Sequence, residues 1–237
     1  MQNQLKQLIF VKMFIMNFDN LVDEILDHPN AEEVVEKVRD ELEKEKKARL
    51  DFRDWLTDDI KAEFINGEIV MHSPVKRGHL EVSENLFRLL SIYVLMNKLG
   101  RVSIEKALIG LKRNDYEPDL VYWNNEQAKD FNQETMVHPV PSLVVEILSK
   151  STKARDKGIK FKDYAAHGIP EYWIIDYQQQ TLEQYFLADD SARAYTLLHE
   201  LSKQDHLKSI IIEGFEIPVA AIFEEQENLK ALKTLVK

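Results

Sequence analysis

Cysteine is missing from all 237 residues of this chain. The protein therefore has no disulfide framework, no thiolate metal ligand and no cysteine nucleophile. Long hydrophobic runs are missing as well. The longest one near the amino terminus, Leu8 to Met16, is interrupted by Lys12, is too short to span a bilayer and lacks the small-residue pattern of a cleavage site. We therefore expect a cytoplasmic protein without a membrane partner.

A basic excess is also missing. The chain holds 31 Lys and Arg residues against 41 Asp and Glu residues, which gives a net charge of -10. This balance argues against a broad electrostatic attraction to nucleic acid, which normally comes from a basic surface. A local basic patch is still available in one run of residues, namely Lys150, Lys153, Arg155, Lys157, Lys160 and Lys162.

The composition is that of an ordinary globular protein, with 44% apolar and 30% charged residues. Residues 18–50 are predicted to be helical, and in their later part charges surround a thin apolar line at helical spacing. Short alternating elements begin near Asp51. We therefore predict a helical extension at 1–50, one compact domain at 51–225 and a tail at 226–237.

The compact domain is predicted to start with a hairpin at 62–70, because Asn66-Gly67 supplies the positive backbone dihedrals of a tight turn. A helix at 79–99 follows from apolar residues at helical spacing. The remaining predicted elements are strands at 102–112, 118–123 and 143–148, a turn at Asn114 and Asp115, a helix from Ser151 or Thr152 to Gly168, and strands at 171–177, 181–187, 194–199 and 207–212. The central order, α-β-β-β-α-β, predicts an α/β fold whose last crossover is parallel and right-handed.

One acidic residue interrupts an otherwise apolar strand. Glu146 stands in the run LVVEIL at 143–148, which is typical of a buried strand. An ionised carboxylate in such a place costs several kcal/mol unless a cation or several hydrogen-bond donors compensate it. Glu146 is therefore the first candidate for a functional residue.

Asp119 is the natural partner of Glu146, because it stands at the start of another predicted strand, directly after Pro118. If the two strands are neighbours, their carboxylates can converge on one divalent cation. Mg²⁺ and Mn²⁺ prefer hard oxygen ligands, and Mg²⁺ usually takes one or two carboxylates together with water and phosphate. Such a site suits phosphodiester hydrolysis, because the cation activates water and stabilises charge on the phosphoryl oxygens.

Lys160 lies four residues after Asp156 and four before Tyr164, so the three share one stripe of the predicted helix. A lysine that faces the cation site would orient the attacking water or neutralise the scissile phosphate. Taken singly, Asp119 or Lys160 is also compatible with a solvated surface group, since charged residues mostly lie outside. Glu146 fits that interpretation less well because its neighbours are those of a buried strand.

These residues also carry a family resemblance. The ordered set Pro118-Asp119, Glu146-Ile147-Leu148-Ser149, Ser151-Thr152, Asp156 with Lys160 and Tyr164, and Gly168-Ile169-Pro170-Glu171-Tyr172-Trp173 followed by Asp176 resembles the signature of the Uma-two family. The stretch from Phe64 to Val70, with Ser73-Pro74 and His79, resembles its amino-terminal portion. The resemblance implies a member of the PD-(D/E)XK superfamily, with a restriction-endonuclease-like core in which helices flank a central mixed β-sheet.

The resemblance also implies a set of site residues. Asp119 matches the aspartate of the Pro-Asp motif, Glu146 matches the glutamate of the following strand, and Lys160 matches a relocated lysine on the next helix. Glu68 and His79 match the upstream motif. The implied cofactor is Mg²⁺ or Mn²⁺, held by Asp119 and Glu146.

One departure from the superfamily pattern concerns the lysine. The superfamily usually has a lysine two residues after the glutamate, and in this chain Leu148 stands at that position. Further carboxylates are available on the predicted helix at Glu81 and Glu84.

Two functions compete at this point. The resemblance implies a metal-dependent endonuclease that hydrolyses phosphodiester bonds in DNA, and a homodimer is expected because paired sites cut both strands of a duplex. The alternative is a catalytically silent module of the same fold that binds a protein or nucleic-acid partner. The acidic net charge and Leu148 favour this alternative.

Two smaller groups also have two interpretations. Tyr172 and Trp173 could stack on bases, but aromatic residues on such a strand are more typical of a core. Ser149, Ser151 and Thr152 could contact phosphate or simply cap the following helix.

Overall fold

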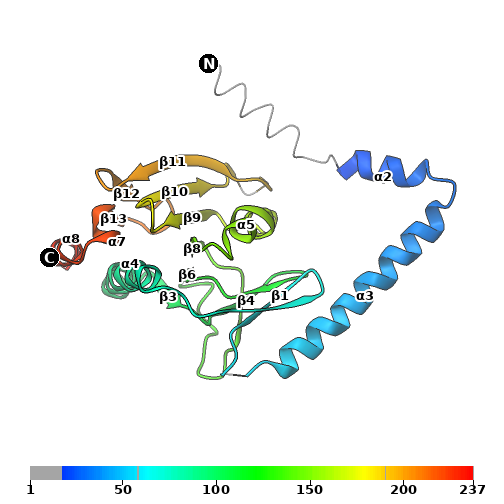
Figure 1. Cartoon of the computed structure of the whole chain (residues 1–237), viewed down its shortest axis with the longest axis horizontal. Coiled ribbons are helices and arrows are strands. Elements are labelled where there is room, and N and C mark those ends of the chain that lie inside the picture. Colours follow the sequence, from blue (N-terminus) through cyan, green and yellow to red (C-terminus); the bar gives the residue numbers. More distant parts are fainter. Residues whose placement is uncertain (1–17, 58, 190, 237) are drawn as a thin grey trace, which may run out of the picture. The chain divides into compact units, whose positions relative to one another are not determined.

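The computed structural model describes residues 18–57, 59–189 and 191–236. Contacts divide the chain into two units after Asp54. The first unit contains the helices α2 (Phe18–Leu26) and α3 (Ala31–Trp55) (Figure 1). The predicted helical stretch at 18–50 is thus two helices, and Pro29 lies in the break between them. Proline cannot donate the backbone hydrogen bond of a helix interior and disfavours helical geometry in the residue before it.

A six-stranded sheet forms the centre of the second unit. Its spatial order is β11-β10-β9-β8-β6-β3. The strands are β3 (Gly100–Ile104), β6 (Leu120–Asn124), β8 (Leu143–Ile147), β9 (Glu171–Asp176), β10 (Thr181–Phe186) and β11 (Thr196–Ser202). Only the β8–β9 pair is parallel in this sheet, and the crossover between them carries the predicted helix. The predicted mixed sheet flanked by helices is confirmed.

A second sheet has the order β2-β1-β5-β4-β7. Its strands are β1 (Ala62–Ile65), β2 (Glu68–Met71), β4 (Leu108–Gly110), β5 (Asp115–Tyr116) and β7 (Val137–His138). The predicted hairpin is the β1–β2 pair, and Asn66 and Gly67 take positive φ values of 48° and 86° at its turn.

The prediction of one strand at 102–112 is wrong. That segment divides between β3 and β4, which belong to different sheets, and Glu105 between them has a φ of 59°. A left-handed residue breaks the extended backbone and redirects the chain. The predicted turn at Asn114 and Asp115 is also displaced, because Asp115 begins β5 and the turn lies before it.

Hydrophobic cores cover both faces of the six-stranded sheet. On one face, the sheet packs against α4 (Arg77–Met96), with Leu86 and Leu90 among the contacts. On the other face, it packs against α6 (Phe161–Ala166) and residues of the second sheet. Neighbouring residues of a strand point to opposite faces. Val145 joins the α4 side and Val144 joins the α6 side, so Glu146 faces the α6 side.

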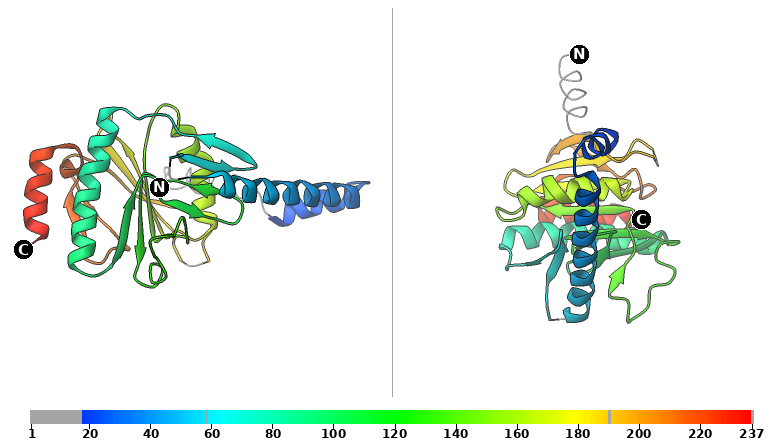
Figure 2. Two further views of the ribbon diagram at one scale, coloured as in Figure 1. Left: turned by 90° about the horizontal axis from the view of Figure 1, so that it is seen from below. Right: turned by 90° about the vertical axis from the view of Figure 1, so that its right-hand side faces the viewer.

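The end of the chain also packs in this unit. The small sheet of β12 (His206–Lys208) and β13 (Glu216–Pro218) leads to α7 (Ala220–Phe223) and α8 (Glu225–Leu235). Figure 2 shows α8 alongside α4, where the buried Asn228 amide donates to the Asn85 carbonyl oxygen at 2.9 Å. Most of the segment 226–237, predicted as a tail, is therefore the packed helix α8, which ends at Leu235.

Among the residues that the structure describes, no helix combines the length and the apolar character needed to cross a membrane.

Candidate active site

Asp119 and Glu146 meet where β6 and β8 lie side by side. The antiparallel register pairs Leu120 with Val145, and extending it by one residue places Asp119 opposite Glu146. Residues opposite each other in an antiparallel pair point to the same face. Asp119 Oδ2 also accepts a hydrogen bond from the backbone amide of Ile147 at 2.7 Å. The sheet itself therefore brings the two predicted carboxylates together.

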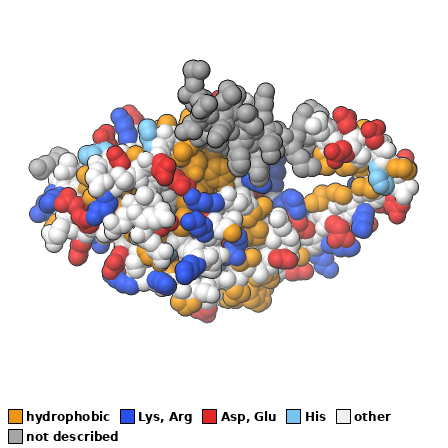
Figure 3. Space-filling model, turned by 45° about the horizontal axis from the view of Figure 1, so that its top comes forward, with side chains coloured by type: hydrophobic (Ala, Val, Ile, Leu, Met, Phe, Trp, Pro, Cys, Tyr) orange, Lys and Arg blue, Asp and Glu red, His pale blue; other side chains and the backbone are white. Residues whose placement is uncertain are grey.

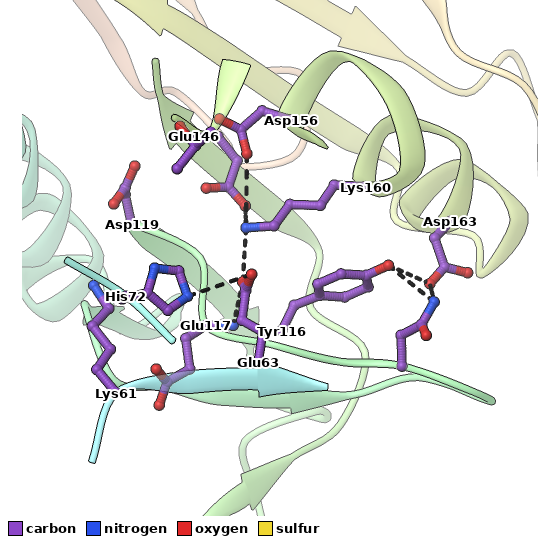
Figure 4. A network of polar contacts seen from close by, with 12 residues as sticks. Lys61, Glu63, His72, Tyr116, Glu117, Asp119, Glu146, Asp156, Lys160 and Asp163 are labelled. Atoms are coloured by element: carbon purple, nitrogen blue, oxygen red, sulfur yellow. Dashed lines mark hydrogen bonds and ion pairs between the residues drawn. The ribbon is translucent and has the colours of Figure 1, made fainter. Parts of the chain in front are cut away.

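Lys160 lies at the centre of a group of carboxylates (Figure 4). Its side-chain nitrogen, Nζ, is 2.8 Å from Glu63 Oε1 and 2.9 Å from Glu146 Oε1. A third carboxylate, that of Asp156, is 3.8 Å away. The exposed fractions of Lys160, Glu63, Glu146 and Asp156 are 2%, 0%, 4% and 1%. This is a buried ionic group with one cation and three acidic partners, which we call the Lys160 cluster.

The crossover helix positions two members of this cluster. It consists of α5 (Lys153–Arg155), a π-helical turn at Asp156–Lys160 and α6. The wide π-helical turn has Asp156 at its start and Lys160 at its end, and such turns are frequent at functional sites. One turn later, the hydroxyl of Tyr164 donates to Glu146 Oε1 at 2.8 Å. The predicted stripe of Asp156, Lys160 and Tyr164 therefore exists and faces Glu146.

Two histidines that are not members of the Lys160 cluster each contact one of the acidic residues. His79 Nε2, on α4, lies 3.3 Å from Asp119 Oδ2, and His72 Nε2 lies 3.4 Å from Glu63 Oε2. Burial alone would lower the pKa of His79, but the hydrogen bond to Asp119 and the charge of that carboxylate raise it overall. His79 therefore favours the charged form of Asp119.

The pKa values show how the charges balance. Burial opposes ionisation throughout the cluster, yet the attraction of Lys160 and the contact with His72 lower the pKa of Glu63 to about 2. Burial, aided by repulsion from Asp156, Asp119 and Glu63, raises the pKa of Glu146 well above its ordinary value despite Lys160. Burial likewise raises the pKa of Asp156 to about 6. The single charge of Lys160 therefore lowers the pKa of Glu63 but does not offset burial at Glu146 and Asp156.

Asp119 behaves differently from Glu146. Burial would raise its pKa, but the hydrogen bonds from His79 and from the Ile147 amide lower it overall. Lys160 is held charged, because the Glu146, Glu63 and Asp156 carboxylates outweigh burial and raise its pKa well above the ordinary value. The site therefore pairs a carboxylate whose pKa is lowered, Asp119, with one whose pKa is raised, Glu146.

The donor set offers two carboxylate ligands to a divalent cation of the Mg²⁺ type. Across residues 18–57, 59–189 and 191–236, no group of three or more His, Asp or Glu side chains is arranged to hold a metal ion. Mg²⁺ nevertheless needs only one or two carboxylates, because water and phosphate complete its shell. Asp119 and Glu146 provide two. Three buried carboxylates share one ammonium group beside them, so added positive charge is favourable at this place.

A cavity of about 400 Å³ opens above these residues. Asp119, Glu117 and Glu146 are the acidic residues of its lining, and the buried Lys160 lies beside them. Its lining also includes the cationic residues Lys76, Lys150 and Arg155, none of which has an ion-pair partner within the described ranges. The cavity therefore combines an acidic interior with an unpaired basic lining.

The structure separates the predicted site residues. Asp119, Glu146, Lys160 and His79 come together, whereas Glu68 lies at the exposed end of the β1–β2 hairpin. Its register partner is Ile65, two residues beyond Glu63, which places Glu68 roughly 7 Å further along the strand. The assignment of Glu68 stays a sequence prediction with no contact to this group. Glu81 and Glu84 are also apart from it, since both contact Arg77 on the outer side of α4.

The remaining sequence interpretations divide in the same way. Tyr172 and Trp173 are fully buried core residues, as the pattern favoured. Ser149 and Thr152 hydrogen-bond to each other's backbone or hydroxyl groups at the start of the crossover helix, and both line the cavity. Their local role is therefore to fix the turn that precedes the π-helical segment.

Sequence reasoning missed Glu63 and His72, and it placed Asp156 on the same helical stripe as Lys160 without assigning it a role. The signal that singled out Glu146 was present for Glu63, which stands among apolar residues in the run Ala62-Glu63-Phe64-Ile65. It was weaker there because the strand has only four residues and is followed by Asn66-Gly67. No local pattern marks His72, whose place depends on how the hairpin packs.

Glu171 is an informative contrast, because it is also a fully buried glutamate on the same sheet. Its carboxylate accepts hydrogen bonds from the Trp173 indole, the Gln184 amide, the Ser209 hydroxyl and the backbone amides of Ile210 and Ile211. Neutral donors satisfy this carboxylate completely, so it needs no cation. Burial of a glutamate is thus not by itself a functional signal. The hydrogen-bond and ionic partners of the carboxylate decide whether it needs a cation.

We predict that Glu171→Gln lowers the free energy of unfolding by about 2 kcal/mol, because an amide NH₂ group then faces donors in a buried site. Denaturant unfolding measures this loss. Mn²⁺ binding by the folded variant should match that of the wild type in calorimetric titration, and a weaker affinity would show that this second glutamate also influences the cation site.

Comparison with known proteins agrees with the fold. The model of the Uma2 family, described as "Putative restriction endonuclease", matches residues 49–220. The chain is 31% identical over 127 residues to an uncharacterized protein of Synechocystis sp., a match that covers 53% of this chain and 71% of that protein. A solved structure described as a putative nuclease belonging to DUF820, from Anabaena variabilis, has a TM-score of 0.61 and 14% identity, and the match covers 73% of this chain and 94% of that one.

The mixed sheet with its flanking helices is an α/β fold that the chain shares with this solved structure. The Uma2 model matches most of the chain, residues 49–220, and the chain therefore belongs to the Uma2 family.

Proposed function

We propose that this protein is a Mg²⁺- or Mn²⁺-dependent endonuclease that hydrolyses phosphodiester bonds in DNA. The observation that carries the proposal is the pair of opposed carboxylates, Asp119 and Glu146, beside a buried lysine in the interior of a cavity. The family description points to the same reaction class.

Each residue has a defined part in this proposal. Asp119 and Glu146 would hold the divalent cation, which supplies charge stabilisation at the phosphoryl oxygens and activates water. His79 keeps Asp119 ionised and oriented through their 3.3 Å contact. Lys160 brings a permanent positive charge beside Glu146. It comes from the crossover helix, whereas the superfamily lysine usually stands on the strand, two residues after the glutamate. Leu148, which occupies that position, is buried in the core and cannot perform this role.

The basic lining supports a polyanionic substrate. Lys76, Lys150 and Arg155 line the same cavity as the carboxylates, so a phosphate at the centre would have further cations beside it. The surface as a whole does not provide this attraction, because the chain carries a net charge of -10 and the face in Figure 3 mixes Lys and Arg with Asp and Glu. Local contacts to phosphate, rather than a broad field, would position the nucleic acid.

Plasmid nicking tests the proposal. We expect the wild-type protein to nick supercoiled DNA with Mg²⁺ or Mn²⁺ and to lose this activity with EDTA. Glu146→Ala should reduce the rate by at least about 1,000-fold, because a group that holds the cation acts in the transition state. Absence of metal-dependent cleavage on single-stranded, duplex and supercoiled DNA would instead favour the silent module that binds a partner.

Homodimerisation remains part of the proposal as well. Cutting both strands of a duplex requires two sites, and a twofold dimer is the simplest way to supply them.

A further inference from the structure

Asp156 is a buried carboxylate on the crossover helix whose two oxygens are both without a regular hydrogen bond among the described residues. Its exposed fraction is 1%. Burial raises the pKa of Asp156 overall, although Lys160 and the Thr152 hydroxyl act to lower it. A buried carboxylate without partners is costly, so it calls for a specific explanation.

The nearest cation to Asp156 is the Lys160 ammonium group, at 3.8 Å. This distance is an ion pair without a hydrogen bond, whereas Glu63 and Glu146 lie at hydrogen-bond distance from the same nitrogen. A lysine ammonium group has three N–H donors. Two of them are used by Glu63 and Glu146, so one remains for which Asp156 is the adjacent acceptor.

Lys160 and the proposed cation compete for Glu146. The Glu146 Oε1 atom already accepts from Lys160 at 2.9 Å and from the Tyr164 hydroxyl at 2.8 Å. A divalent cation on this carboxylate would repel the ammonium group. The lysine then needs another acceptor, because a buried charge without a partner costs several kcal/mol.

We propose that Asp156 is a positioning residue that receives the Lys160 ammonium group when a divalent cation engages Glu146. The inference rests on the proposed function. Lys160 keeps its 2.8 Å contact with Glu63 while it moves from Glu146 to Asp156, because that contact does not involve Glu146. Asp156 and Lys160 are the first and last residues of the same π-helical turn. A rotation of the lysine side chain therefore suffices, and no backbone movement is needed. Figure 4 shows the ammonium group between the three carboxylates.

A double-mutant cycle of Mn²⁺ affinity, measured by calorimetric titration, tests this role. We expect Asp156→Asn to weaken Mn²⁺ binding by about tenfold, because Lys160 stays on Glu146 and competes with the cation. In a Lys160→Met background the same change should matter less than about twofold, since the competing ammonium group is absent. An equal loss in both backgrounds would mean that Asp156 attracts the cation directly, and it would overturn the proposal.

Asp176→Asn is the matched control. It also removes one carboxylate near the cavity, but Asp176 contacts Lys153 and the amides of Gln178 and Gln179 instead of Lys160. Its effect on Mn²⁺ affinity should stay within about twofold. A tenfold loss in this control would assign the effect of Asp156→Asn to general electrostatics and would also overturn the proposal.

A crystal structure of the wild type with Mn²⁺ provides a test that does not depend on the folding of any variant. The proposal expects the Lys160–Asp156 distance to fall from 3.8 Å into hydrogen-bond range while the Lys160–Glu146 distance lengthens from 2.9 Å. Bound Mn²⁺ with Lys160 still on Glu146 would overturn this inference alone. A wild type that binds no Mn²⁺ would overturn the proposed function and this inference with it.

Discussion

Lys160→Met is expected to lower the free energy of unfolding by about 3–5 kcal/mol at pH 8, which is the usual cost of removing one partner from a buried ionic group. The change leaves Glu63, Glu146 and Asp156 buried next to one another without their cation. Their pKa values in the folded variant should then lie above those in the unfolded chain, because burial and mutual repulsion are no longer opposed.

The pH dependence of this loss has a definite sign. A carboxyl group with a raised pKa in the folded state binds more protons there than in the unfolded state, so stability falls as pH rises above its unfolded value of about 4.3. The Lys160→Met variant should therefore be closest to the wild type near pH 5 and furthest from it near pH 8. Denaturant unfolding across this range measures the difference.

Lys157→Met is the control for this experiment. Lys157 belongs to the same π-helical turn and contacts Glu183 at 2.6 Å, but its side chain is 36% exposed. A partly exposed ion pair contributes about 0–1 kcal/mol, so this variant should remain near the wild type at both pH values. Equal losses in the two variants would contradict the view that Lys160 neutralises the buried carboxylates.

Mn²⁺ binding to the wild type is expected to strengthen steeply with pH. Burial, with repulsion from Asp156, Asp119 and Glu63, raises the pKa of Glu146, so the group keeps its proton well into the pH range where a free glutamate has lost it. A cation must displace that proton, and its affinity then rises by up to about tenfold per pH unit. Asp119 does not add to this slope, because its pKa is lowered and it is already ionised.

Calorimetric titration in buffers of different ionisation enthalpy measures the effect, since it counts the protons released. We expect a net release of protons on Mn²⁺ binding near pH 6, from Glu146, whose pKa is raised, and from Asp156, whose pKa is about 6. An affinity that stays constant from pH 5 to pH 8, with no proton release, would show that the cation does not replace a proton on Glu146.

Much of the central architecture could be predicted because it depends on local signals. The Asn66-Gly67 turn, the apolar spacing of α4 and the apolar run of β8 each lie within one short segment. The separation of β3 from β4 could not be predicted, because it depends on which sheet each strand joins. A left-handed φ at Glu105 leaves no clear trace in the residue types around it.

The candidate site shows the same division. Glu146 was visible because an acidic residue in an apolar strand is locally conspicuous. Glu63 was not preferred to Glu68, although both stand in the same hairpin, because only the packing of that hairpin places one beside Lys160 and the other at an exposed tip. His72 depends on the same packing.

The sequence by itself therefore determined most of the central elements, the crossover and the presence of a carboxylate that required compensation. Only the tertiary structure decided what compensates it. Glu63, Glu146 and Asp156 come from β1, β8 and the π-helical turn, and they meet at one ammonium group. Charges interact through space over a few ångströms whatever their separation in the chain, so the identity of the partners is a property of the fold.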